Sequence, residues 1–81
     1  MEIKMSLLSQ RLKLLRKEKG VTQQNIAGLL GKTSRHYQDI ESGKINVPAL
    51  TLIKLADYFQ VSLDYLVGRS EERGDFHGEQ S

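Results

Sequence analysis

Two short helical patterns in residues 22–44, separated by one glycine, constrain the fold most. In the first pattern, apolar residues repeat at helical spacing after Thr22, which is a favoured N-cap residue. Gly31 then stands where that helix must stop and the chain must reverse. Thr33 caps the second pattern in the same way. The segment therefore predicts two helices joined by a tight turn.

The second of these helices is expected to keep one face polar. Tyr37 and Ile40 lie three residues apart and share an apolar face. The polar residues on or near the opposite face are Ser34, Arg35, Gln38 and Asp39. Such a helix can pack through its apolar face and leave a hydrogen-bonding edge exposed to a partner.

Three further helices are predicted around this pair. Residues 6–19 carry leucines at helical spacing, residues 48–59 combine an N-terminal proline with an i, i+3, i+4, i+7 apolar stripe, and residues 62–67 follow a serine cap. We therefore expect an all-α fold of five helices. On the first helix, we expect a basic face made by Arg11, Lys13 and Lys17.

Length and composition predict one small domain. The chain has 81 residues and no cysteine, so neither a disulfide framework nor a thiolate metal ligand is available. We expect the domain to span residues 1–69, with residues 70–81 forming a polar, disordered tail. No apolar run approaches the roughly 20 residues that span a bilayer, and the first residues do not resemble a signal peptide. A cytoplasmic protein without a membrane partner is expected.

Charge is distributed unevenly along the chain. Residues 1–48 hold nine Lys or Arg against four Asp or Glu, a net charge of +5, whereas residues 49–81 hold three against six, a net charge of −3. A basic half is what a protein needs to approach a phosphate backbone from one side. An ordinary solvated surface explains the charge alone equally well.

Residue patterns typical of catalysis and metal binding are absent from the sequence. His36 and His77 stand far apart, without cysteine or an HExxH-type spacing, so we expect no metal site. There is no Ser, His and Asp set and no glycine-rich phosphate loop. We therefore expect no cofactor and no enzymatic activity.

The whole arrangement resembles the helix-turn-helix family of phage repressors and Cro proteins, often called the Xre family. The similarity covers about residues 8–69 and includes RLKLLRKEKG, TQQNIAGLLGKTSRHYQDIESGK and TLIKLADYFQVSLDYLVGR in the right order. It implies a five-helix, lambda-repressor-like domain with the motif at the second and third helices. It also implies that the third helix lies in the major groove of double-stranded DNA.

The resemblance assigns roles to individual residues. Base-reading or flanking positions fall on Ser34, Arg35, Asp39, Gln38 and His36, and phosphate-binding positions fall on Thr22, Gln23, Lys32, Thr33, Lys44 and Asn46. Arg35 is the first choice for guanine, because its fork can bond O6 and N7 together. Asp39 either accepts from cytosine or pairs with a basic residue of its own chain, and the threonines also act as helix caps. Arg16 and Glu41 resemble a structural ion pair of the family.

Some positions depart from the family pattern. Asn25 stands where an acidic residue often completes a capping box with Thr22, and Gly28 inside the second helix should cost about 1 kcal/mol relative to Ala. Leu14, with Leu7 one heptad earlier, forms an apolar strip on the first helix. This strip either binds a protein partner or is covered by residues 1–5.

The resemblance implies a sequence-specific regulator of transcription, most simply a repressor that occupies an inverted-repeat operator. One reading helix buries little DNA, so a homodimer with half-sites about 34 Å apart is expected. We place the dimer surface around the last helix, at Tyr58, Tyr65, Leu66 and Val67, although core packing explains some of these residues equally well. The alternative function is a protein-interaction module, antitoxin-like or regulator-binding, with DNA contact secondary.

Overall fold

Five α-helices make up the structure, a computed structural model that describes residues 5–74. In chain order they are α1 (Met5–Lys19), α2 (Gln23–Leu30), α3 (Ser34–Glu41), α4 (Ala49–Phe59) and α5 (Leu63–Leu66). No strand occurs in the described range, and the predicted all-α, five-helix fold is confirmed.

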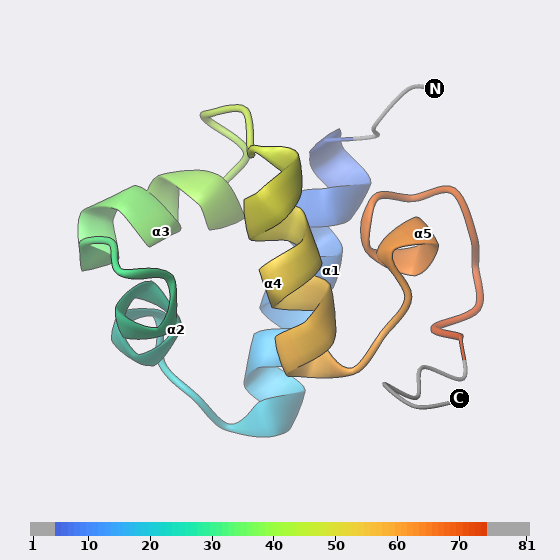
Figure 1. Ribbon diagram of the computed structural model, residues 1–81, viewed down its shortest axis with the longest axis horizontal. Helices are drawn as coiled ribbons and strands as arrows, with labels where there is room; N and C mark the ends of the chain where they lie inside the picture. The colour runs from blue at the N-terminus through green and yellow to red at the C-terminus, as the bar shows by residue number, and fades with distance from the viewer. Residues whose placement is uncertain (1–4, 75–81) are drawn as a thin grey trace.

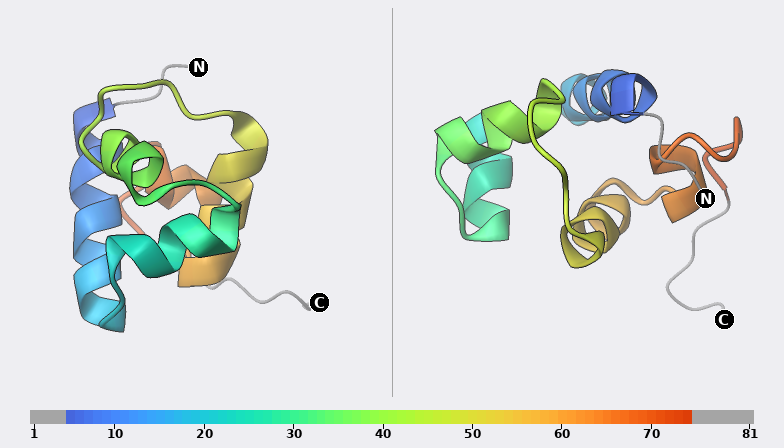
Figure 2. Two further views of the ribbon diagram at one scale, coloured as in Figure 1. Left: turned by 90° about the vertical axis from the view of Figure 1, so that its left-hand side faces the viewer. Right: turned by 90° about the horizontal axis from the view of Figure 1, so that it is seen from above.

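The helices form two ends joined by a central pair. α1 and α4 lie at the centre, α2 and α3 form one end, and α5 lies at the other (Figure 1). Figure 2 shows that α3 reaches from α2 to α1, and that the loop after α3 then carries the chain across to α4. The predicted helix-turn-helix therefore occupies one end of the molecule.

Local signals in the sequence fix both helices of the motif. The Thr22 and Thr33 hydroxyls accept hydrogen bonds from the backbone N–H groups of Asn25 and His36, each at 3.0 Å. Gly31 ends α2 with φ of 69°, a left-handed conformation that favours glycine. Asn25 also accepts from the Thr22 backbone N–H at 3.0 Å, so the capping box is complete although it lacks an acid.

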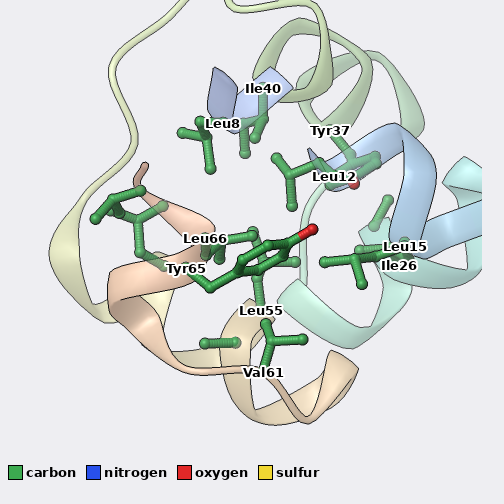
Figure 3. Close-up of a cluster of buried hydrophobic side chains, with 14 residues drawn as sticks. Leu8, Leu12, Leu15, Ile26, Tyr37, Ile40, Leu55, Val61, Tyr65 and Leu66 are labelled. Atoms are coloured by element: carbon green, nitrogen blue, oxygen red, sulfur yellow. The ribbon is translucent and has the colours of Figure 1, made fainter. Parts of the chain in front are cut away.

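One apolar core joins all five helices (Figure 3). Leu8, Leu12 and Leu15 of α1 are 0–4% exposed and form its spine. The residues that the other elements add are Ile26, Ala27, Tyr37, Ile40, Leu52, Leu55, Ala56, Val61, Tyr65, Leu66 and Val67. The i, i+3, i+4 spacing read from the sequence corresponds to this buried face in α1 and α4.

The predicted dimer surface is wrong for three of its four residues. Tyr65, Leu66 and Val67 are 6%, 0% and 2% exposed, because α5 packs its apolar side chains onto α1 and α4. Tyr58, the fourth, is half-buried on α4. Core packing, the alternative considered for these residues, is what the structure shows for α5.

Arg11 also differs from its prediction. It is only 7% exposed and does not belong to a basic face, unlike the exposed Lys13 and Lys17. Its guanidinium lies 4.0 Å from the centroid of the Tyr65 ring and donates to the backbone carbonyl of Tyr65. A cation stacked on an aromatic ring and bonded to buried carbonyls stabilises the packing of α5 on α1.

Residues 70–74 contact the helices, unlike the disordered tail predicted from residue 70. Arg11 donates to the Ser70 carbonyl at 2.8 Å, and the Arg73 carbonyl accepts from the Ser62 N–H at 2.6 Å. The Arg73 guanidinium forms two hydrogen bonds with the Glu18 carboxylate, at 2.8 and 2.9 Å. Residues 75–81 lie outside the described range, and the domain boundary at residue 69 stays a prediction.

Candidate nucleic-acid interface

One buried face fixes α3 to the domain. Tyr37, Ile40 and Glu41 are 0–1% exposed, which leaves the other side of this eight-residue helix to solvent. The exposed residues on that side are Ser34, Arg35 and Gln38, whereas His36 and Asp39 are half-buried. The five predicted base-reading residues therefore lie on one short helix at the end of the molecule (Figure 2).

Arg35 extends into solvent and has an acidic neighbour. Its side chain is 78% exposed, and its Nε lies 3.7 Å from Oδ1 of Asp39, one turn along the helix. This is the intrachain pairing considered for Asp39. An exposed i, i+4 pair at this distance is weak and leaves guanidinium N–H groups free to bond a partner.

Gln23, at the first position of α2, has a role that the sequence did not indicate. Its side-chain amide donates to Oε1 of Glu41 at 3.1 Å, so α2 is tied to the end of α3. The hydroxyls of Thr22 and Thr33 cap their helices, as predicted. Backbone N–H groups at the first turn of α2 lack partners inside the helix, as at every helix N-terminus.

The remaining predicted phosphate-binding residues lie on either side of α3. Lys32 is exposed in the turn before the helix, and Lys44 and Asn46 are exposed in the loop after it. Among the described residues, neither lysine takes part in an ion pair. The polar face of α3 is thus flanked by ammonium groups.

The predicted ion pair between Arg16 and Glu41 is present in the structure. Nε and Nη2 of Arg16 donate to the two carboxylate oxygens of Glu41 at 2.8 and 3.1 Å. Arg16 also donates to the Val21 carbonyl at 3.3 Å. The pair joins the end of α1 to the end of α3, and the Val21 contact adds the chain that leads into α2. It therefore holds both motif helices against α1.

Electrostatics around Glu41 favour its charged form. Burial raises the pKa of the Glu41 carboxyl, but hydrogen bonds from Arg16 and Gln23 lower it more, and the resulting pKa lies below the ordinary value. The hydrogen bond to Glu41 raises the pKa of Arg16. Burial, with the Glu41 charge, raises the pKa of Tyr37, so all three groups keep their usual protonation state at neutral pH.

The burial of Glu41, which we did not predict, has a signal in the sequence. Residues 37, 40 and 41 stand at i, i+3 and i+4, so Glu41 shares the apolar face of α3. Its partners Arg16 and Gln23 are 25 and 18 residues away, and Ser9, which donates to the Glu41 carbonyl, is 32 residues away. No local rule connects positions so far apart.

The described residues contain neither a cluster of three or more metal-ligating side chains nor a helix long and apolar enough to cross a membrane. His36 lies on α3, and His77 is outside the described range. The exposed groups around α3 are hydroxyl, amide, guanidinium and ammonium groups. These groups can donate hydrogen bonds to phosphates and base edges.

Comparisons with known proteins agree with this geometry. The profile of a family described as helix-turn-helix matches residues 12–66, which is more than half of the 81-residue chain. The chain belongs to the helix-turn-helix family. The resemblance proposed from the sequence is thereby confirmed. The matched range begins inside α1 and ends with α5, so it includes all the helices that carry the site.

Individual helix-turn-helix relatives are also similar. The chain is 43% identical over 68 residues to the uncharacterized HTH-type transcriptional regulator YqaE of Bacillus subtilis (strain 168), covering 83% of this chain and 59% of that protein. It is 39% identical over 61 residues to the SPbeta prophage-derived uncharacterized HTH-type transcriptional regulator YonR of the same strain, covering 75% and 56%. The chain thus spans somewhat more than half the length of these two relatives.

A solved helix-turn-helix structure shares the fold. The crystal structure of a transcriptional regulator from Listeria innocua superposes with a TM-score of 0.74 at 32% sequence identity. The superposition covers 93% of this chain and 67% of that protein.

Proposed function

We propose that this chain binds double-stranded DNA and regulates transcription by placing α3 in the major groove of a specific operator. The observation that carries the proposal is the division of α3 into a face anchored by Tyr37, Ile40 and Glu41 and a face of exposed donors. The major groove admits an α-helix and presents a distinct pattern of donors and acceptors for each base pair. The transcriptional regulators similar to this chain support the same function.

Arg35 is proposed as the main base-reading residue. Its 78% exposed side chain keeps free N–H donors beside the weak contact to Asp39, and a guanidinium can bond both O6 and N7 of guanine. Ser34 and Gln38 on the same face add shorter polar contacts. His36 lies at the flank, and Asp39 orients Arg35 or accepts from cytosine N4.

Phosphate contacts are proposed on both sides of α3. Lys32 and Lys44 are exposed near the two ends of the helix and can neutralise backbone charges on either side of the groove. Asn46 adds a donor in the loop after α3. At the N-terminus of α2, the residues with backbone or hydroxyl donors for a phosphate are Thr22, Gln23 and Thr33.

Repression by a homodimer is the proposed mode of action. One eight-residue helix contacts few base pairs, whereas two copies related by a two-fold axis read two half-sites about one helical turn apart. Occupying such an inverted repeat would block transcription from an overlapping promoter. The proposed site of action is the cytoplasm, where the DNA of a bacterium or phage is located.

Selection of bound sequences from a random duplex library tests this function. Purified protein at about physiological salt should enrich an inverted repeat with half-sites about 34 Å apart. An Arg35→Ala variant, with the exposed Lys13→Ala on α1 as the matched control, should lose the enrichment while keeping its helical circular dichroism. Enrichment by Arg35→Ala equal to that of the unaltered protein would contradict the proposed role of α3.

A protein-interaction module remains the second candidate, because Leu14 on α1 is 46% exposed. Leu7 is half-buried, and residues 1–4, part of the segment considered as a cover for this strip, lie outside the described range. If the library selection shows no enrichment and a Leu14→Glu variant abolishes binding to a protein captured by the unaltered chain, this second function replaces the first.

A further inference from the structure

The outer face of α4 carries an apolar stripe that the domain does not cover. Leu50 is 76% exposed, more than any other large apolar residue in the described part of the chain, and Ile53 is 43% exposed. They stand at i and i+3, with Lys54 at i+4 and Asp57 at i+7, so all four share one face of the helix. The opposite face packs into the core through Leu52 and its neighbours, and in the described part of the chain this second stripe does not belong to the core.

A hollow of about 440 Å³ adjoins the same stripe. Lys54, Asp57 and Tyr58 of α4 line one side, and Leu29 of α2, itself 47% exposed, lines the other. Leu50 therefore protrudes near the start of α4, and the hollow lies one to two turns further along. A protrusion and a hollow on one surface are what a self-complementary contact requires.

The charges on this face are also self-complementary. Lys54 and Asp57 are exposed, and neither forms an ion pair with another described residue. When two copies of the face meet about a two-fold axis near these residues, Lys54 of each copy comes opposite Asp57 of the other. The symmetry therefore creates two ion pairs close to the axis, with apolar side chains beside them.

We propose that the outer face of α4 is the surface through which two copies of this chain pair. Leu50 and Ile53 of one copy pack toward the hollow between α2 and α4 of the other, and the two Lys54–Asp57 pairs fix the relative orientation. The inference rests on the proposed function, in which a two-fold dimer reads two half-sites. One axis then relates both α4 contacts and both α3 helices, so this contact sets the spacing between the reading helices.

Other exposed apolar groups fit a second copy less well. Beside Leu14 on α1, Lys17 is basic, and the acidic Glu18 one turn further along is already paired with Arg73 of its own chain. Tyr65 and Leu66 of α5 and the following Val67 are buried in the core and cannot form a contact surface without unfolding. The α4 face combines exposed apolar area, an adjoining hollow and unpaired charges of both signs among the described residues.

A charge exchange tests the pairing in the absence of DNA. Sedimentation velocity from about 10 μM to about 1 mM protein should show a monomer–dimer equilibrium, with amide chemical shifts on α4 changing on dilution. Lys54→Asp or Asp57→Lys should each weaken the dimer about tenfold or more, because two attractive pairs become repulsive. The double variant, Lys54→Asp with Asp57→Lys, should restore dimerisation to within about threefold, because the pairs are rebuilt in reverse.

Substitution of the apolar stripe provides the second arm, with circular dichroism to confirm folding. Leu50→Glu should abolish self-association, and Leu14→Glu, an equally drastic change on α1, should leave it unchanged. A dimer that survives Leu50→Glu, or that Leu14→Glu removes, would overturn the inference, as would a chain that stays monomeric throughout the concentration range. Self-association that follows this pattern in a protein that selects no DNA sequence would support the α4 contact and contradict the proposed function alone.

Discussion

Basic side chains serve opposite purposes at the two ends of this molecule. Around α3, Lys32, Arg35 and Lys44 are exposed and form at most one weak intrachain pair. At the α5 end, Arg11 is 7% exposed and bonds the carbonyls of Tyr65 and Ser70, and Arg73 forms two hydrogen bonds with Glu18. The first group is available to an anionic partner, and the second holds the domain together.

This difference shows why net charge alone does not locate a binding surface. Residues 1–48 carry a net charge of +5, but that sum includes Arg11 and Arg16, which are bound to groups of their own chain. Around α3 the exposed basic residues are Lys32, Arg35 and Lys44. Changes at the α5 end should therefore affect stability, and changes around α3 should affect DNA affinity. The cluster of Glu41 with Arg16 and Gln23 should affect both.

The largest expected effect is that of Glu41→Ala. Removing a carboxylate that is 1% exposed leaves Arg16 and the Gln23 amide without their partner, and the loss of one member of a buried pair typically costs about 3–5 kcal/mol. Urea unfolding followed by circular dichroism measures the loss. Glu72→Ala, an exposed change, should shift the free energy of unfolding by less than about 0.5 kcal/mol. Equal stability of the two variants would show that the cluster does not hold the motif in place.

Arg11→Met is expected to cost about 2 kcal/mol of unfolding free energy, because it removes the guanidinium donors to the carbonyls of Tyr65 and Ser70 and the stacking on the Tyr65 ring. The matched control is Lys13→Met on the exposed side of α1, with little effect. At a temperature where both variants are folded, neither should change DNA affinity as measured by fluorescence anisotropy. A loss of DNA affinity in folded Arg11→Met, but not in Lys13→Met, would contradict the claim that Arg11 contributes to stability alone.

Gly28→Ala should stabilise the motif end by about 0.5–1 kcal/mol. Gly28 lies inside α2 with an ordinary negative φ, and a Cβ built there meets no atom within 4 Å, so alanine gains helix propensity without a clash. Gly31→Ala is the opposed control, because φ of 69° strains any L side chain. Thermal unfolding of both variants measures the two changes in melting temperature. A lower melting temperature for Gly28→Ala would indicate a contact at this position that the structure does not show.

Acid should weaken the domain through Glu41 and, to a smaller extent, Glu18. Hydrogen bonds hold the pKa of both carboxyls below the ordinary value of 4.5 in the folded chain, so their contribution to stability is complete above that value and is lost as pH falls through the folded pKa. Urea unfolding between about pH 7 and pH 2.5 measures this slope. Glu41→Gln should flatten it, and an unchanged slope would contradict the ionised form of Glu41.

Much of the fold follows from short-range signals. Thr22, Thr33 and Gly31 mark helix ends within a few residues of the groups that they bond or terminate, and the leucines of α1 repeat on one face. Such relations are local, so the sequence alone predicts them. Local signals do not suffice for α5, because four residues are too few to distinguish a core face from a dimer face by periodicity. The prediction that Leu66 lies on a dimer surface is therefore wrong.

The arrangement of the site was less predictable than its members. The exposed residues of α3 could be identified from spacing and resemblance, but the amide of Gln23 bonds Glu41 across 18 residues and Arg11 bonds Ser70 across 59. These contacts depend on how whole helices pack. Arg11 lies on the core face of α1, but its burial can be recognised only once the packing of α5 and residues 70–74 is known.

The most direct test of the central claim is the salt dependence of DNA binding by the unaltered chain and by Arg35→Ala, each on a selected duplex and on a scrambled duplex of the same composition. If α3 reads bases, log K should fall steeply with log salt for the unaltered chain on both duplexes. Arg35→Ala should lose about 1–3 kcal/mol of binding free energy on the selected duplex and much less on the scrambled one. Equal affinity of the unaltered chain for both duplexes, or an equal loss on both for Arg35→Ala, would contradict base reading by α3.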